Sequence, residues 1–155
     1  MTPLPHRYFV TATGSHDGDV ALDTPQVATL RSASPAEFGG PGNRWSPETL
    51  LVAAVADCFL LTFRAVAEAS GLPWASLQCE VEGTLDRIER ALQFTRFDLR
   101  AHLEVPAGVD VELARRVLEK SERACLVSNS LKAASHLQSS IRVGSTDSQL
   151  ALSCS

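Results

Sequence analysis

The sequence predicts an α+β fold in which antiparallel strands surround one long apolar helix. Residues 46–70 have the pattern of a single helix that is apolar on almost every side. Residues 77–85 and 94–105 alternate apolar and polar side chains, which is typical of half-buried strands. Residues 110–124 repeat apolar side chains at helical spacing and predict a second helix. Together these segments indicate helices packed on a sheet.

The N-terminal third predicts a small antiparallel meander. Residues 8–12, 20–22 and 26–33 read as short strands separated by turn residues. Residues 38–43 contain Gly39, Gly40, Pro41 and Gly42 and are expected to form a loop.

The first helix has clear start and stop signals. Ser46 suits the N-cap, Pro47 the first helical position and Glu48 the first turn. Gly71 is expected to end the helix. The central run LLVAAVADCFLLTF is apolar nearly all round, and a chain of 155 residues has difficulty burying such a helix on every side. We therefore expect it to pack against a partner subunit.

The second helix presents a cysteine toward the core. Asp110 suits its N-cap, and Val111, Ala114, Leu118 and Cys125 share one face at helical spacing. The thiol of Cys125 is therefore expected on the core side, near the end of the helix.

We expect one domain over residues 1–144, followed by a loose tail over residues 145–155. A short helical turn within residues 129–134 and a last strand over residues 137–143 are expected to complete this domain.

The composition argues against partners that require a strongly basic surface. The net charge is −4 and the isoelectric point about 5.5, which favours neither nucleic acid nor an anionic membrane. The first ten residues have no apolar signal segment. The longest apolar stretch, residues 50–63, is interrupted by Asp57 and is too short to span a bilayer. We expect a cytoplasmic protein without a membrane partner.

Cysteine is the residue type with the clearest chemical potential. The four cysteines are widely and irregularly spaced, without a CxxC motif: Cys58, Cys79, Cys125 and Cys154. This pattern predicts neither a zinc ribbon nor a thioredoxin motif, and the histidines show no ligand spacing, so we expect no metal and no cofactor. In a reducing compartment a pair that cycles between thiol and disulfide would be catalytic. The alternative is that each cysteine is a small buried apolar residue, which we expect for Cys79 and Cys154.

Two motifs resemble those of the OsmC/Ohr family. The run SPAEFGGPGNRWSPETLLVAAVADCF is similar to the family's first-cysteine segment, with Cys58 ten residues after Glu48. The run ACLVSNSLKA looks like the second-cysteine segment, and Cys125 follows Cys58 at close to the family interval. The resemblance covers residues 8–143.

This resemblance implies an intertwined homodimer with two long central helices packed against antiparallel sheets. It also implies a thiol peroxidase that reduces organic hydroperoxides to alcohols, with hydrogen peroxide as a further candidate substrate. Cys58 would be the nucleophile and Cys125 the thiol that closes a disulfide with it. Glu48 would pair with an arginine that stabilises the thiolate. The reductant would be an external dithiol, a dihydrolipoyl group in the Ohr branch.

The activating arginine departs from the family pattern. The Ohr branch has a Gly-Arg-Asp-Gly-like turn where this chain has His16, and the OsmC branch has an arginine where this chain has Phe38. Arg44 and Arg31 are the remaining candidates. We favour Arg44 because it is four residues from Glu48 and a guanidinium can donate twice to a carboxylate. Because the arginine is missing at both family positions, the alternative function is that of a non-enzymatic dimer that binds a ligand or senses redox state.

Helix geometry separates Glu48 from Cys58 by about 15 Å. One glutamate cannot reach a thiol that far along its own helix, so we expect each active site to use both subunits. Phe38, Trp45 and Phe59 are candidates for an apolar pocket that holds the organic part of a peroxide, although such aromatic residues are often core.

Overall fold

The computed structural model describes residues 2–145. These residues divide into two compact units, the first ending at Leu51 and the second beginning at Val52. The long helix α1 (Pro47–Ala69) begins in the first unit and continues into the second.

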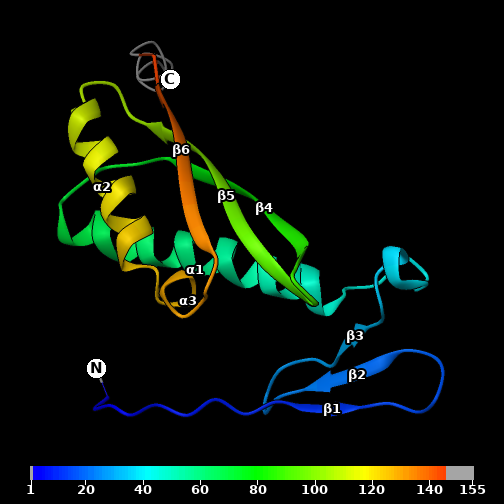
Figure 1. Cartoon of the computed structure of the whole chain (residues 1–155). Coiled ribbons are helices and arrows are strands. Elements are labelled where there is room, and N and C mark those ends of the chain that lie inside the picture. Colours follow the sequence, from blue (N-terminus) through cyan, green and yellow to red (C-terminus); the bar gives the residue numbers. More distant parts are fainter. Residues whose placement is uncertain (1, 146–155) are drawn as a thin grey trace, which may run out of the picture. The chain divides into compact units, whose positions relative to one another are not determined.

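The first unit contains a three-stranded antiparallel sheet, as the sequence predicted (Figure 1). Its elements are β1 (Thr11–Thr13), β2 (Val20–Asp23), β3 (Leu30–Ser32) and the 3₁₀ helix η1 (Ala36–Phe38). The first and third strands are shorter than expected. Tyr8 is 92% exposed and Val27 is 65% exposed, so the apolar residues that suggested longer strands have no core to pack on within this unit.

The second unit contains a sheet in the order β4–β5–β6. Its strands are β4 (Ser76–Ile88), β5 (Ala91–Val105) and β6 (Ala134–Val143). The hairpin β4–β5 is antiparallel as predicted, whereas β6 runs parallel to β5. The reason is the connection between them: α2 (Val111–Ala124) and α3 (Leu126–Asn129) carry the chain back to the starting edge, as a parallel pair requires. The helical turn that was predicted within residues 129–134 is α3, which lies a few residues earlier.

The predicted boundaries of both long helices are confirmed. At the start of α1 the Thr49 amide donates to Ser46 Oγ at 3.2 Å, and the Ser46 amide donates to Thr49 Oγ1 at 2.8 Å, a reciprocal cap. The helix ends at Ala69, and Gly71 has a φ of 62°. Asp110 caps α2 by accepting a hydrogen bond from the Glu112 amide at 2.9 Å.

Helix α1 is apolar beyond what the single chain buries. Its fully or nearly fully buried residues form one stripe, made of Val55, Phe59, Phe63, Val66 and Ala67. Its most apolar 18-residue window has a mean hydropathy of 2.0 but is only 28% buried. By length and composition alone this helix could cross a membrane, which the shorter run of residues 50–63 had not suggested. A buried core helix has the same length and composition, so these two properties do not indicate a membrane helix by themselves. The apolar surface that α1 leaves exposed, including the half-exposed Leu61, is the feature that needs an explanation.

One face of the second sheet forms the core. The buried residues of β5 alternate along the strand: Phe97, Leu99, Ala101, Leu103 and Val105. Both helices pack on this face. A Cβ at Gly83 of β4 would lie 2.8 Å from Val52 of α1, and Ser135 of β6 donates to Glu122 of α2 at 3.2 Å. We refer to this side of the sheet as the inner face.

The contact at Gly83 predicts a stability defect. In the Gly83→Val variant the new side chain would meet Val52 Cγ2 and Phe94 Cε1, both 2.8 Å from an ideal Cβ. We expect a loss of about 1–3 kcal/mol in the free energy of unfolding, since an overpacked core must move side chains or backbone. Urea denaturation measures the change. Glu82→Val, on the exposed side of the same strand, is the control, and equal midpoints for the two variants would contradict the close packing.

Candidate active site

The structure brings the two predicted cysteines together in the second unit. Cys58 is half-buried on α1, and Cys125 is fully buried where α2 ends and α3 begins. Burial is the main cause of a raised pKa of the Cys125 thiol, and the neighbouring Cys58 side chain raises this pKa further. A buried thiol beside a second thiol is the arrangement that disulfide formation requires.

Cys125 is positioned by the turn that follows it. The Ser128 hydroxyl donates to Cys125 Sγ at 3.4 Å, and the Asn129 amide donates to the Cys125 carbonyl at 3.0 Å. The hydrogen bonds from Ser128 lower the pKa of Cys125 and so offset part of the effect of burial. Ser128 belongs to the segment CLVS that suggested the second cysteine, but the sequence did not show that it contacts the thiol.

Cys58 has one polar neighbour on its own helix. Its Sγ lies 3.9 Å from Thr62 Oγ1, one helical turn further on. Within residues 52–145, no hydrogen bond joins Cys58 to a basic side chain. The second unit therefore supplies the two sulfur atoms of the predicted site.

Cys79 is part of the same group of thiols, which the sequence interpretation did not foresee. It is half-buried on β4, and its pKa is raised to about 11, first by burial, then by the charge of Cys125, then by that of Glu80. Among the described residues no group of three His, Cys, Asp or Glu side chains has the arrangement of a metal site. Cys154, the other cysteine expected to be a bystander, lies outside the described residues.

The raised pKa of Cys79 predicts slow alkylation. At pH 8 a thiol with a pKa of about 11 has roughly 100-fold less thiolate than one with the ordinary value near 9, and thiolate is the reactive form. We expect iodoacetamide to modify Cys79 at least about 100-fold more slowly than a free cysteine peptide, with a rate that rises about tenfold per pH unit. Peptide mass spectrometry over pH 7–10 measures this rate. A pH-independent rate, or one equal to that of the peptide, would contradict the burial of this thiol.

Glu48 lies in a pocket of the first unit. The pocket has a volume of about 410 Å³ and is lined mainly by apolar side chains, among them Val20, Leu22 and Phe38. Glu48 Oε2 is buried and has no hydrogen-bond partner within the described residues. A buried carboxylate oxygen without a partner is costly, so this atom marks a place where a donor is needed.

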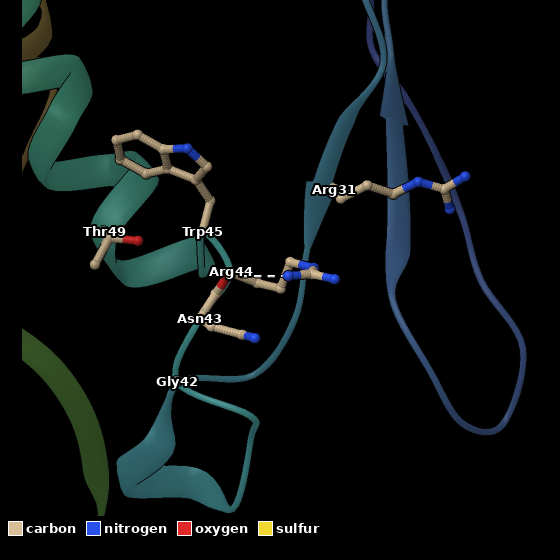
Figure 2. Close-up of a pocket in the computed structure, with 6 residues that line it drawn as sticks. All are labelled: Arg31, Gly42, Asn43, Arg44, Trp45 and Thr49. Atoms are coloured by element: carbon tan, nitrogen blue, oxygen red, sulfur yellow. Dashed lines mark hydrogen bonds between the residues drawn. The ribbon is translucent and has the colours of Figure 1, made fainter.

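Arg44 does not fill that place. Its Nε donates to Asp19 Oδ2 at 2.8 Å and its Nη1 donates to the Asn43 carbonyl at 3.1 Å. The expected ion pair between Arg44 and Glu48 is therefore not formed in the described chain, because Asp19, the residue before β2, pairs with the guanidinium instead. Figure 2 shows Arg31 extending from β3 away from Arg44.

The other predicted site residues have different surroundings. His16 lies 3.6 Å from Asp17, and both side chains are largely exposed. Trp45 is 49% exposed and lines, with Arg44 and Arg31, a second pocket of about 330 Å³ in the first unit. Phe38 is 51% exposed, whereas Phe59 is completely buried. Phe59 therefore belongs to the core rather than to a substrate pocket.

Known proteins resemble this chain in sequence and in fold. The family model described as OsmC-like protein matches residues 40–140. An uncharacterized protein of Bacillus subtilis, YmaD, is 30% identical over 90% of this chain and 97% of its own length. The peroxiredoxin OsmC of Escherichia coli is 28% identical over 57% of this chain and 61% of its own length.

A solved structure supports the same relationship. An OsmC organic hydroperoxide resistance protein of Legionella pneumophila, also described as a predicted redox protein, has a TM-score of 0.71 and is 25% identical. The match covers 91% of this chain and all of that one. The residues matched by the family model include both Cys58 and Cys125. This chain belongs to the OsmC-like family.

Proposed function

We propose that this protein is a thiol-dependent peroxidase that reduces organic hydroperoxides in the cytoplasm. The observation that carries the proposal is the proximity of the Cys58 and Cys125 thiols on the inner face of the second unit. The names of two relatives, a peroxiredoxin and an organic hydroperoxide resistance protein, support the reaction type.

In the proposed reaction the Cys58 thiolate attacks one peroxide oxygen. The O–O bond breaks, an alcohol leaves after taking up a proton, and Cys58 becomes a sulfenic acid. The Cys125 sulfur then attacks the Cys58 sulfur, water leaves, and a Cys58–Cys125 disulfide forms. An external dithiol, such as a dihydrolipoyl group, reduces this disulfide by exchange.

The surroundings of the two thiols suit different roles. Cys58 is only half-buried in the single chain, so its sulfur is not enclosed by its own subunit. Cys125 is fully buried and its pKa is raised, so it stays largely a thiol at neutral pH. Because thiolate is the form that attacks peroxides, Cys125 does not compete for the peroxide and remains reduced until the sulfenic acid forms beside it.

We propose that the enzyme is a homodimer whose active sites use both subunits. The apolar surface of α1 that the single chain leaves exposed would be covered by the partner. Glu48, Phe38 and Trp45 of one subunit would then help to form the site around Cys58 of the other, and Arg44 or Arg31 would supply the cation that stabilises the Cys58 thiolate.

Shared sites predict complementation between inactive variants. A mixture of Glu48→Gln and Cys58→Ser proteins, exchanged by mild denaturation and refolding, should recover roughly a quarter of wild-type activity, because half the dimers are mixed and each has one complete site. Peroxide consumption measures the recovery. Mixed dimers identified by mass spectrometry that stay inactive would place Glu48 and Cys58 in the same subunit's site, whereas a Glu48→Gln protein that is active by itself would place Glu48 outside the site.

A simple assay tests the activity. The protein is incubated with cumene hydroperoxide and either dithiothreitol or dihydrolipoamide, and peroxide loss is followed with time. We expect multiple turnovers, and the first disulfide that forms in samples quenched before the reductant is added should join Cys58 and Cys125. Absence of both turnover and disulfide would overturn the proposal.

A second candidate function follows from the position of Arg44. Because its guanidinium pairs with Asp19 rather than Glu48, the chain could be a non-enzymatic dimer that binds a ligand or senses redox state. This alternative predicts a single stoichiometric oxidation of the cysteines without turnover in the same assay.

A further inference from the structure

We propose that Cys79 is a third redox thiol, which accepts the disulfide from Cys58 by exchange through Cys125. The inference rests on the proposed peroxidase function and extends it. It assigns to Cys79 the reaction that frees Cys58 for a second peroxide before any external reductant arrives.

The sheet places Cys79 on the face where the other two thiols lie. Cys79 pairs with Ala101 of β5, which in turn pairs with Ser139 of β6. Ala101 is completely buried on the inner face, and residues directly opposite each other point to the same side of a sheet. The Cys79 side chain therefore points to the inner face, toward the helices.

The contact between α1 and β4 sets the position of Cys79 along the sheet. The two elements run in opposite directions (Figure 1), and Val52 meets Gly83 near one end. From that contact Cys58 lies about 9 Å along α1, and Cys79 lies about 13 Å back along β4. The two cysteines therefore lie on the same side of the Val52–Gly83 contact, one on the helix and one on the strand.

Cys125 connects the two. Its pKa responds to Cys58, and the pKa of Cys79 responds to Cys125. The titratable groups that raise the pKa of Cys79 are Cys125, at the end of α2, and Glu80, which follows Cys79 and points to the exposed side of β4. Its neighbours on β5 and β6, Ala101 and Ser139, do not titrate. Cys125 is thus the thiol neighbour that Cys58 and Cys79 share.

The chemistry needs no additional oxidant or reductant. Cys79 loses its proton to water, and its thiolate attacks Cys125 Sγ of the Cys58–Cys125 disulfide. The Cys79–Cys125 bond forms, the Cys58–Cys125 bond breaks, and Cys58 leaves as a thiolate. Thiols of high pKa are poor leaving groups, so a disulfide between Cys79 and Cys125 is retained once formed.

The relay predicts a different stoichiometry of peroxide consumption without reductant. Fully reduced wild-type protein should consume about two equivalents per chain. The first forms the disulfide that moves to Cys79–Cys125, and the second forms a sulfenic acid on the freed Cys58, which dimedone can trap. The Cys79→Ala variant should consume one equivalent and give no dimedone adduct, because its disulfide stays on Cys58.

The experiment uses reduced full-length protein with Cys154→Ser in every sample, treated with cumene hydroperoxide and then blocked with acid and a maleimide. Peptide mapping locates the disulfide. A Cys79–Cys125 linkage in the parent protein, at a rate that rises about tenfold per pH unit, supports the relay. A Cys58–Cys125 linkage that persists for hours, with one equivalent consumed by both proteins, overturns the relay while leaving the proposed peroxidase intact.

A second measurement distinguishes a failure of the relay from a failure of the proposed peroxidase function. The Cys58→Ser variant is equilibrated in buffers of oxidised and reduced dithiothreitol, so that no peroxide chemistry is needed. Formation of Cys79–Cys125 there shows that the pair can bond even if the protein proves not to be a peroxidase. If no such disulfide forms at any ratio, and circular dichroism shows a folded protein, Cys79 has no redox role.

Discussion

The Cys58→Ser variant is expected to lose peroxidase activity by at least about 10³-fold, as removal of an enzyme's nucleophile usually does. A serine hydroxyl has no anionic form at neutral pH to attack the peroxide, and no other thiol has the same position. Cys125 is fully buried, and the pKa values of both Cys125 and Cys79 are raised. Neither can take over the attack.

Cumene hydroperoxide consumption with saturating dithiothreitol measures this loss. Cys154→Ser is the matched control, since it makes the same chemical change in the C-terminal segment and should keep wild-type activity. Thermal unfolding of both variants checks that the loss is not a folding defect. A Cys58→Ser protein that turns over at more than a few per cent of the wild-type rate would show that another group is the nucleophile.

Patterns within single segments predicted the helices and the main hairpin well. Capping residues such as Ser46 and Asp110 gave the helix starts because the same local hydrogen bonds form in the structure. The alternation along β4 appears in its burial pattern. These features depend on neighbours in the chain, which the sequence displays directly.

The direction of β6 and the partner of Arg44 could not be predicted in the same way. Each depends on which distant segment comes alongside. Alternation gives the faces of a strand but not its direction. Closeness in sequence favoured Glu48 as the partner of Arg44, whereas in the structure Arg44 pairs with Asp19, which is 25 positions away.

The three thiols Cys58, Cys79 and Cys125 include both a predicted feature and one that the sequence did not predict. Resemblance to a family suggested Cys58 and Cys125 as a pair, and the structure places them together. Cys79 was interpreted as a bystander because no motif contains it. Cys79 comes close enough to be affected by Cys125 only because the β4–β5 hairpin pairs it with Ala101, on the inner face of the sheet. A cysteine on the alternating apolar side of a strand was the one sequence signal, and it is equally typical of a core residue.

The Cys125→Ser variant is expected to carry out one normal turnover and then accumulate oxidised Cys58. The first step needs only Cys58, so the initial burst of alcohol should keep its wild-type rate. Without the neighbouring sulfur the sulfenic acid cannot close a disulfide, and excess peroxide converts it to sulfinic acid, which thiols do not reduce. The serine hydroxyl can still interact with Ser128, which donates to the native thiol, so the fold should survive.

Rapid-quench measurement of alcohol and intact mass spectrometry of the protein follow the two stages. Steady-state activity should fall at least about tenfold while the burst amplitude stays near one per chain. The variant also tests whether Cys58 and Cys79 are linked only through Cys125. If Cys125 is the only link between Cys58 and Cys79, no Cys58–Cys79 disulfide forms and over-oxidation proceeds. If that disulfide forms instead and the protein resists over-oxidation, Cys79 reaches Cys58 directly and Cys125 is not the obligatory resolving thiol.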